Sequence, residues 1–129
     1  MDPADLKTLP LFASLSDDDL ARLSRWADDV DVPAGKHLVE EGAWAWEFFV
    51  ILEGEAEVFR GSEHLADLGP GDFFGEMGVR EHQQRSATVV AKTAVRIGVM
   101  LERDFHEMEE EMPAVASMIT TEIEQRRTR

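Results

Sequence analysis

Cysteine is absent from the 129 residues of the chain. Its absence excludes disulfide bonds, thiol nucleophiles and zinc sites built from thiolates. It is also typical of a reducing compartment, so we expect a cytoplasmic protein. Long apolar runs are missing too, because the longest extends only from Phe48 to Leu52, whereas a membrane helix needs about 18 residues. Residues Met1 to Lys7 lack the apolar segment of a secretory signal, so the sequence predicts neither export nor a membrane span.

Positive charge is scarce. Lysine and arginine together number 13, against 27 aspartates and glutamates, so the formal net charge is −14. A field of that sign repels nucleic acids and anionic membranes at long range. The short basic tail from Arg126 to Arg129 fits the favourable placement of cations at the C-terminal end of a helix. We therefore predict no direct binding to nucleic acid or to a membrane.

Familiar metal-binding and hydrolytic motifs are missing as well. The four histidines are His37, His64, His82 and His106. None of them falls in an H-x-H or H-E-x-x-H spacing, and neither a G-x-S-x-G elbow nor a G-x-x-x-x-G-K-S/T loop occurs. The sequence therefore predicts no metal, no cofactor and no catalysis. A cupin-like metal enzyme remains an alternative, since catalytic groups assemble in space rather than along the chain.

The patterns that are present describe a single packed domain over residues 1–129, with 43% hydrophobic residues and no linker. Residues 1–30 have helical spacing, with Ser16 as an N-cap before three aspartates. Apolar residues recur at this spacing as far as Val30. A shorter helix is expected to begin at Pro3, because proline suits the first helical position.

Residues 31–101 have a β pattern, because short apolar runs are separated by glycine, proline and acidic turn signals. The runs are 37–39, 47–52, 56–59, 65–68, 87–91 and 95–101. Many short strands with frequent turns are typical of an antiparallel barrel or jelly roll. Residues 102–129 return to helical spacing, and Pro113 marks a break between two helices. The predicted fold class is therefore α+β.

Two apolar features allow more than one partner. The last helix carries a narrow stripe made of Val115, Met118, Ile119 and Ile123. Such a stripe packs either on the barrel or across a dimer. Trp44 and Trp46 flank Ala45 and alternate onto one face. Core packing is the expected role of these aromatic rings, with an exposed contact surface as the alternative.

The segment from Phe73 to Thr88 holds the candidate binding chemistry. Gly75 lets a backbone approach a ligand closely, and Glu76 can accept hydrogen bonds from hydroxyl groups. A helix start after Glu76 offers backbone N–H groups to an anion. Arg85, nine residues after Glu76, can hold a phosphate with two parallel hydrogen bonds. These residues predict a site for a small organic phosphate that also carries sugar hydroxyls.

The glycine framework around this segment resembles that of the cyclic nucleotide-binding domain family. It consists of Gly35, Gly42, Gly54 and Gly71, followed by Phe74-Gly75-Glu76-Met77-Gly78 and by Arg85-Ser86-Ala87-Thr88-Val89. The order of helices, barrel and helices is similar too. The resemblance implies an eight-stranded antiparallel β jelly roll over residues 31–101, also called a double-stranded β-helix. N-terminal helices over 1–30 and two C-terminal helices over 102–129 would flank it, and residues 73–88 would form its phosphate-binding cassette.

The resemblance also implies roles for individual residues. Glu76 would accept the ribose 2′-hydroxyl, Arg85 would pair with the cyclic phosphate, and Gly75 would let the ribose approach the backbone. The other implied ligand-binding residues are Met77, Gly78, Val79, Ser86 and Ala87 around the phosphate, and Val58 and Leu65 on the base side. The implied ligand is cyclic AMP (cAMP). Cyclic GMP (cGMP) is the alternative, because a hydroxyl-bearing serine follows Arg85.

Two positions depart from the usual pattern of that family. Arg80 stands where an apolar residue is common, and Gln84 stands where a proline is common. Arg80 would either add a second cation near the phosphate or point into solvent. Without the proline, we expect a less rigid loop before Arg85 and therefore poorer pre-organisation for a ligand.

A sensor or regulatory module without catalysis is the function that the resemblance implies. Ligand binding would shift the helices after Leu101 against the barrel and so signal to an effector protein that the sequence does not identify. The resemblance also favours a homodimer through the C-terminal helix. Two alternatives remain. One is a ligand-silent interaction domain of the same fold that acts through its terminal helices, and the other is a regulatory fragment of a larger protein such as a transcription factor.

Overall fold

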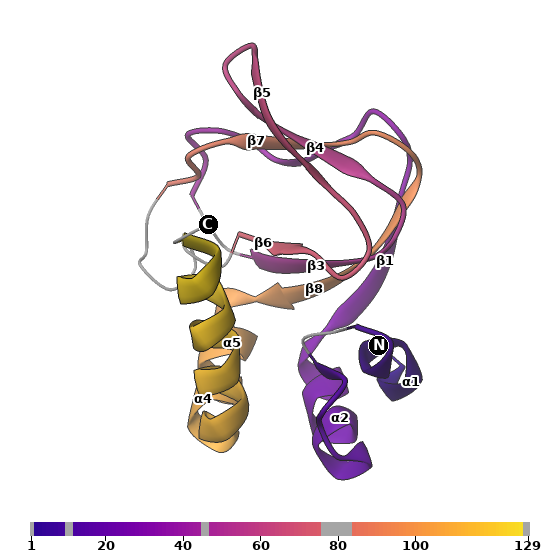
Figure 1. Ribbon diagram of the computed structural model, residues 1–129, viewed down its shortest axis with the longest axis vertical. Helices are drawn as coiled ribbons and strands as arrows, with labels where there is room; N and C mark the ends of the chain where they lie inside the picture. The colour runs from indigo at the N-terminus through magenta and orange to yellow at the C-terminus, as the bar shows by residue number, and fades with distance from the viewer. Residues whose placement is uncertain (1, 10–11, 45–46, 76–83, 128–129) are drawn as a thin grey trace.

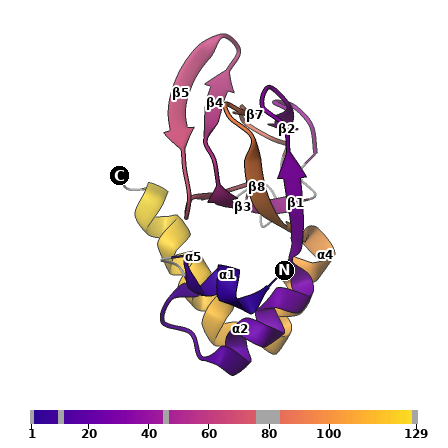
Figure 2. The same cartoon turned by 90° about the vertical axis from the view of Figure 1, so that its right-hand side faces the viewer.

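Two four-stranded antiparallel sheets and two groups of helices make up the computed structural model, which describes residues 2–9, 12–44, 47–75 and 84–127. Both groups of helices lie on the same side of the molecule, next to one of the sheets (Figure 1). The second sheet lies on the far side of the first, away from the helices, as the turned view also shows (Figure 2).

The sheets have the strand order of a jelly roll. The first sheet contains, in order, β1 (Asp28–Val32), β8 (Val95–Leu101), β3 (Glu47–Glu53) and β6 (Phe73–Phe74). The second contains β2 (His37–Val39), β7 (Thr88–Ala91), β4 (Ala56–Arg60) and β5 (Glu63–Leu68). Except for β4 and β5, neighbouring strands are not consecutive in the sequence, so the chain crosses repeatedly between the sheets. The predicted fold class, with its eight strands, is confirmed.

The N-terminal helices begin at Pro3 and directly after Ser16, as the sequence predicts. The side chain of Asp2 accepts a hydrogen bond from the N–H of Ala4 at 2.9 Å. The hydroxyl of Ser16 accepts one from the N–H of Asp19 at 3.1 Å. Each cap satisfies a backbone donor that the first turn of a helix leaves without a partner. The elements are α1 (Pro3–Lys7), α2 (Asp17–Leu23) and the 3-10 helix η2 (Ser24–Trp26).

The helical region ends earlier than its apolar spacing predicts. The spacing extends to residue 30, but the structure places Asp28–Val32 in β1, where Asp29 pairs with Gly98 of β8. Val30 is exposed rather than packed in a helix interface. The prediction is wrong at this boundary because β1 obtains its backbone partners from a strand far away in the sequence, which local spacing does not contain.

Strand β3 divides the interior into two cores. Phe48 and Val50 pack with the helices, whereas Phe49 and Ile51 lie in the core between the two sheets. This division follows from the alternation of side chains along a strand. Each face of β3 is therefore buried against a different layer of the domain.

Helix α4 (Glu102–Glu111) covers the first sheet. Its Phe105 and Met108 are almost fully buried in the helical core. The ring of Phe105 lies 5.8 Å from that of Phe48, centroid to centroid, within the range at which aromatic pairs attract each other. The contact fixes α4 against the beginning of β3.

Helix α5 (Pro113–Arg127) carries the predicted apolar stripe. Val115 and Ile119 are buried in the helical core, and Met118 is partly buried against it. The side chain of Ile123 lies outside the described residues. In its first turns, therefore, the stripe packs on the chain's own core.

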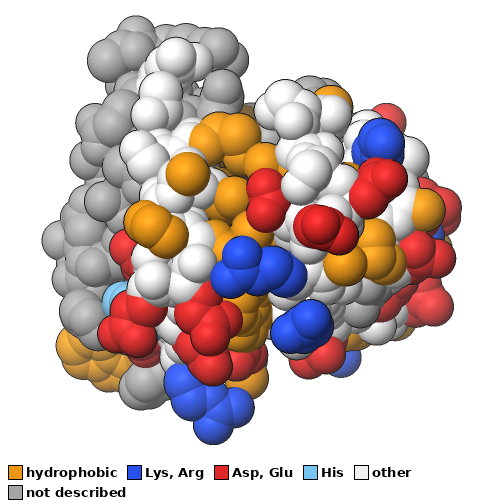
Figure 3. Space-filling view, turned by 90° about the horizontal axis from the view of Figure 1, so that it is seen from below, with side chains coloured by type: hydrophobic (Ala, Val, Ile, Leu, Met, Phe, Trp, Pro, Cys, Tyr) orange, Lys and Arg blue, Asp and Glu red, His pale blue; other side chains and the backbone are white. Residues whose placement is uncertain are grey.

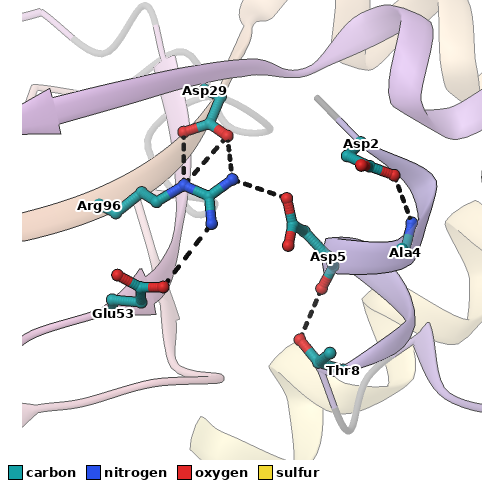
Figure 4. Close-up of polar contacts among 7 residues, drawn as sticks. All are labelled: Asp2, Ala4, Asp5, Thr8, Asp29, Glu53 and Arg96. Carbon is teal, nitrogen blue, oxygen red and sulfur yellow. Dashed lines mark hydrogen bonds and ion pairs between the residues drawn. The ribbon is translucent and has the colours of Figure 1, made fainter.

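A charged network ties α1 to the first sheet (Figure 4). The guanidinium of Arg96 on β8 donates to both carboxylate oxygens of Asp29 on β1. It also donates to Oδ2 of Asp5 on α1 at 2.6 Å, and Oε1 of Glu53 lies 3.7 Å from Nη1. The hydrogen bond from Arg96 lowers the pKa of Asp29, and the carboxylates raise the pKa of Arg96. Charge pairing thus adds to apolar packing in positioning α1.

Candidate functional site

Arg85 is a buried cation with a fixed orientation. Its side chain is only 5% exposed. Nη1 donates to the carbonyl of Gly75 at 2.8 Å, and Nη2 donates to the carbonyl of Glu47 at 2.6 Å. The guanidinium carbon also lies 5.9 Å from the centre of the Phe49 ring. These contacts hold the guanidinium plane in place, which is what a bidentate contact to a phosphate requires.

Gly75 directly follows β6 and lies in contact with this guanidinium. Its φ is +86°, a conformation that residues with a side chain rarely adopt. A Cβ atom at this position would lie 2.6 Å from Nη1 of Arg85 and 2.9 Å from the carbonyl oxygen of Glu47. The absence of a side chain at Gly75 is therefore what allows Arg85 to reach the backbone here.

A short antiparallel pairing holds the backbone of Arg85. The N–H of Gly42 donates to the carbonyl of Arg85 at 2.9 Å, and the N–H of Arg85 donates to the carbonyl of Ala43 at 2.7 Å. Trp44 pairs with Gln84 one step further along. Trp44 is 59% exposed, so core packing, the role expected from the sequence, is wrong for Trp44.

The segment after the buried arginine is tied to two neighbouring parts of the second sheet. Nε of Arg60 donates to the carbonyl of Ser86 at 3.3 Å. The hydroxyl of Thr88 accepts a hydrogen bond from the N–H of Glu41 at 2.9 Å. Ser86 is exposed and Ala87 is half-buried. Ser86 and Ala87 thus follow Arg85 in a backbone that is held at two points.

The two residues expected on the base side differ in their surroundings. Val58 on β4 lies opposite Val89 of β7 and packs against the core between the sheets. Leu65 is 40% exposed. It lies on β5 where Ala66 pairs with Val58 and His64 pairs with the next residue of β4, so Leu65 is the extra residue of a bulge. Val58 therefore faces the interior of the roll, whereas Leu65 is largely in solvent.

Several predicted residues lie outside the described part of the chain. They are Glu76, Met77, Gly78, Val79, Arg80 and His82, all within residues 76–83, together with Trp46. Among the described residues, the structure brings Gly75 into contact with the guanidinium of Arg85, and the phosphate contacts expected of Ser86 and Ala87 stay predictions. The ribose contact of Glu76 stays a prediction.

Glu47 is a contact that sequence reasoning missed. It begins β3, and besides its carbonyl contact its carboxylate Oε2 lies 3.7 Å from Nη2 of Arg85. The one signal in the sequence is that a carboxylate heads an otherwise apolar run as far as Leu52. The two partners are 38 positions apart, so no local spacing could have paired them.

Three side chains of the kinds that bind metals lie close together on the hairpin of β4 and β5. Glu57, His64 and Asp67 place ligand atoms within 4.8 Å of one another, and no further group of this kind is found in the described ranges. Nε2 of His64 lies 2.8 Å from Asp67 and 3.5 Å from Glu57. Glu57 and Asp67 face each other across the strands. A hydrogen-bonded imidazole between two facing carboxylates accounts for this cluster as a cross-strand side-chain contact.

The family model of the cyclic nucleotide-binding domain matches residues 29–111. The match begins in β1 and ends with α4, so it includes both sheets and the segment from Gly75 to Arg85. The chain belongs to this family. The resemblance read from the glycine framework is thereby confirmed, and the cupin-like alternative has no support.

Known cyclic nucleotide-binding proteins resemble the chain over most of its length. A cAMP-dependent protein kinase regulatory subunit of Aspergillus fumigatus is 36% identical over 96 residues, which is 73% of this chain and 23% of that protein. A cyclic nucleotide-gated potassium channel of Rhizobium etli is 34% identical over 111 residues, covering 86% of this chain and 31% of the channel. The crystal structure of the catabolite activator protein of Thermus thermophilus superimposes with a TM-score of 0.83 at 26% identity, covering 91% of this chain and 57% of the other.

The cyclic nucleotide-binding domain is a regulatory, ligand-binding module. The chain spans less than a third of the length of the two curated relatives named above. No helix in the described part of the chain has both the length and the apolar character needed to cross a membrane.

Proposed function

We propose that this cyclic nucleotide-binding domain binds a 3′,5′-cyclic nucleotide, cAMP in the first place, and acts as a sensor without catalysis of its own. The observation that carries the proposal is the buried guanidinium of Arg85, aligned by the carbonyls of Gly75 and Glu47. In a chain with a net charge of −14, the long-range potential repels anions. A cation at this depth therefore acts locally, and the two exocyclic oxygens of a cyclic phosphate match its planar fork.

The remaining contacts in the proposal follow the family pattern. Glu76 holds the ribose 2′-hydroxyl, and Gly75 lets the ribose lie against the backbone. The backbone groups of Met77, Gly78, Val79, Ser86 and Ala87 surround the phosphate, and Val58 and Leu65 lie beside the base. The position of Val58 on the inner face of the second sheet supports its assignment.

The preference for cAMP over cGMP is drawn from a relative. The Aspergillus fumigatus protein that is 36% identical is a regulatory subunit of a cAMP-dependent protein kinase. The hydroxyl of Ser86 is compatible with either nucleotide. Both nucleotides therefore belong in the binding experiment.

A route from the site to the helices runs through β3. Glu47 and Phe49 contact the guanidinium of Arg85. Phe48, between them, packs against Phe105 of α4 at 5.8 Å. A ligand that moves Arg85 would displace β3 and, with it, the surface on which α4 packs. This requires that the ligand bind the original and the displaced arrangement with different affinity. The proposed output is a shift of the C-terminal helices that an effector protein reads.

Calorimetric titration with cAMP and with cGMP tests the proposal, after unfolding and refolding have removed any co-purified nucleotide. We expect one nucleotide bound per chain. Arg85→Lys keeps the charge but loses the fork, and should bind at least about tenfold more weakly, since a charged hydrogen bond contributes about 1.5–3 kcal/mol. Arg103→Ala removes an exposed arginine and should leave the affinity unchanged. No heat with either nucleotide would refute the proposal.

A ligand-silent interaction domain of the same fold is the second candidate, and the exposed ring of Trp44 favours it. This candidate predicts a melting temperature that does not respond to nucleotide. It also predicts a protein partner whose binding is lost in Trp44→Ser or on removal of a terminal helix.

We further propose that residues 1–129 act as one regulatory domain in the cytoplasm, either alone or within a larger protein such as a transcription factor. The greater length of the relatives supports the second arrangement, and the absence of cysteine supports the compartment. Apolar side chains flanked by charged ones of both signs gather between the two groups of helices (Figure 3). They support a homodimer contact that includes the C-terminal helix, which sedimentation velocity would test.

A further inference from the structure

Glu47 contacts the guanidinium of Arg85 with two different groups. Its carbonyl oxygen accepts a hydrogen bond from Nη2 at 2.6 Å, and its carboxylate Oε2 lies 3.7 Å from the same nitrogen. The carbonyl orients the cation without changing the net charge of the site. The carboxylate adds a full negative charge. Because 3.7 Å exceeds the about 2.7–2.9 Å of a charge-assisted hydrogen bond, this carboxylate attracts the cation without a short hydrogen bond to it.

The pair lies at the boundary between the protein interior and water. The side chain of Arg85 is 5% exposed and that of Glu47 is 38% exposed. On the interior side, the guanidinium lies over the ring of Phe49, which stacks on Phe74 at 4.9 Å. Any anion that bonds to this guanidinium comes within several ångströms of the Glu47 carboxylate. Their repulsion is screened less than between fully exposed charges.

We propose that Glu47 makes this site selective for phosphates that carry a single negative charge. The inference rests on the proposed function and adds to it a preference for the charge on the phosphate of the ligand. A cyclic phosphodiester carries one negative charge, whereas a phosphomonoester such as 5′-AMP carries about 1.5–2 at pH 7. Arg85 and Glu47 together have no formal net charge. Without Glu47, a second negative charge on the ligand would strengthen its attraction to Arg85. The repulsion from the Glu47 carboxylate offsets that gain.

The expected discrimination is large enough to measure. For charges about 6 Å apart at an effective dielectric constant of about 20, one additional unit of charge lowers affinity about 100-fold. The partial exposure of Glu47 lets water and salt reduce this to about tenfold. The net charge of −14 acts in the same direction. A remote carboxylate that is neutralised in the same way therefore serves as the control.

Displacement of a fluorescent cAMP analogue by three competitors tests the inference. The competitors are cAMP, 5′-AMP and the methyl ester of 5′-AMP, which is acyclic but singly charged. In Glu47→Gln we expect the affinity for 5′-AMP to rise about tenfold relative to both singly charged competitors. Glu110→Gln, an exposed carboxylate on α4, should leave the ratios unchanged. Glu47→Ala should change the ratios in the same direction as Glu47→Gln, and thermal melting of each variant checks that it is folded.

Equal changes for all three competitors in a folded Glu47→Gln would overturn the inference. So would a rise for 5′-AMP and its methyl ester alike, because ring shape rather than charge would then be what Glu47 reads. Loss of cAMP binding in that variant would make Glu47 a positioning residue for Arg85 and would also overturn it. A wild-type chain that binds no cyclic nucleotide removes the proposed function itself. If the wild-type chain binds cAMP but the affinity ratios of the competitors are the same in Glu47→Gln, only the inference is refuted.

Discussion

Replacing Gly75 by alanine places one methyl group in the contact between the end of β6 and the guanidinium of Arg85. The Cβ atom would lie 2.6 Å from Nη1 of Arg85 and 2.9 Å from the carbonyl oxygen of Glu47. Both distances are too short, so the arginine has to leave the Gly75 carbonyl. Alanine would also have to adopt a φ of +86°, which costs about 1–2 kcal/mol for a residue with a side chain.

The two penalties add. Weakening a hydrogen bond from a charged donor costs about 1.5–3 kcal/mol, so Gly75→Ala should destabilise the domain by about 2.5–5 kcal/mol. In a domain of this size that corresponds to a fall of about 10–20 °C in melting temperature. The affinity for cyclic nucleotide should fall at least about tenfold, because the displaced guanidinium no longer presents its fork to the phosphate.

Gly35→Ala is the matched control, because Gly35 has a φ of +87° and no atom lies within 4 Å of the place that a Cβ would take there. Its free energy of unfolding should fall only by the cost of the backbone conformation, about 1–2 kcal/mol, and its nucleotide affinity should not change. Differential scanning calorimetry and titration of both variants measure the difference. Equal melting temperatures together with an unchanged affinity in Gly75→Ala would refute the role assigned to this contact.

Three further predictions concern stability. Because Arg96 holds the pKa of Asp29 below its ordinary value, their pairing stabilises the fold above pH of about 4 and is lost as the pH falls through the lowered pKa. Urea unfolding should show Asp29→Asn less stable than wild type by about 0.2–1 kcal/mol at pH 7, the range of partly exposed ion pairs, and a gap that does not close towards pH 2 would contradict this. Trp44→Ser should keep the melting temperature of the wild type, since its ring lies in solvent, and a fall of several degrees would mean that Trp44 packs in the fold. Ile51 is fully buried between the sheets, so Ile51→Ala should cost about 2–5 kcal/mol in urea unfolding and Ile51→Val about 0.5–1.5 kcal/mol, whereas equal losses would argue against close packing there.

Most of the strands could be predicted from the sequence, because six of the eight contain short apolar runs that local turn signals separate. The other two could not. β1 has the sequence Asp-Asp-Val-Asp-Val with only Val32 buried, and β6 consists of just Phe73–Phe74. Both are strands because β8 and β3 supply their backbone partners. That is a long-range cause which no local pattern contains.

The candidate site divides in the same way between local and long-range information. Gly75 and Arg85 could be singled out because a glycine, a carboxylate and an arginine follow one another in a short, ordered segment. Glu47 could not, since it reaches Arg85 from the start of a different strand. For Trp44, alternation predicted a common face with Trp46 but could not tell which side of the chain that face is on. The exposure of Trp44 in the folded chain decides it.

Strand β3 links the candidate site to the helical core. Along its first residues, Glu47 and Phe49 serve the guanidinium of Arg85, and Phe48 and Val50 serve the helical core. Because the period of a strand is two, a slip by one residue would exchange the two sets. Its long antiparallel pairing with β8 opposes such a slip. In the proposed sensor, a ligand that moves Arg85 would act on β3 as a unit, and Phe48, which contacts Phe105 of α4, is the residue that would pass the movement to the helices.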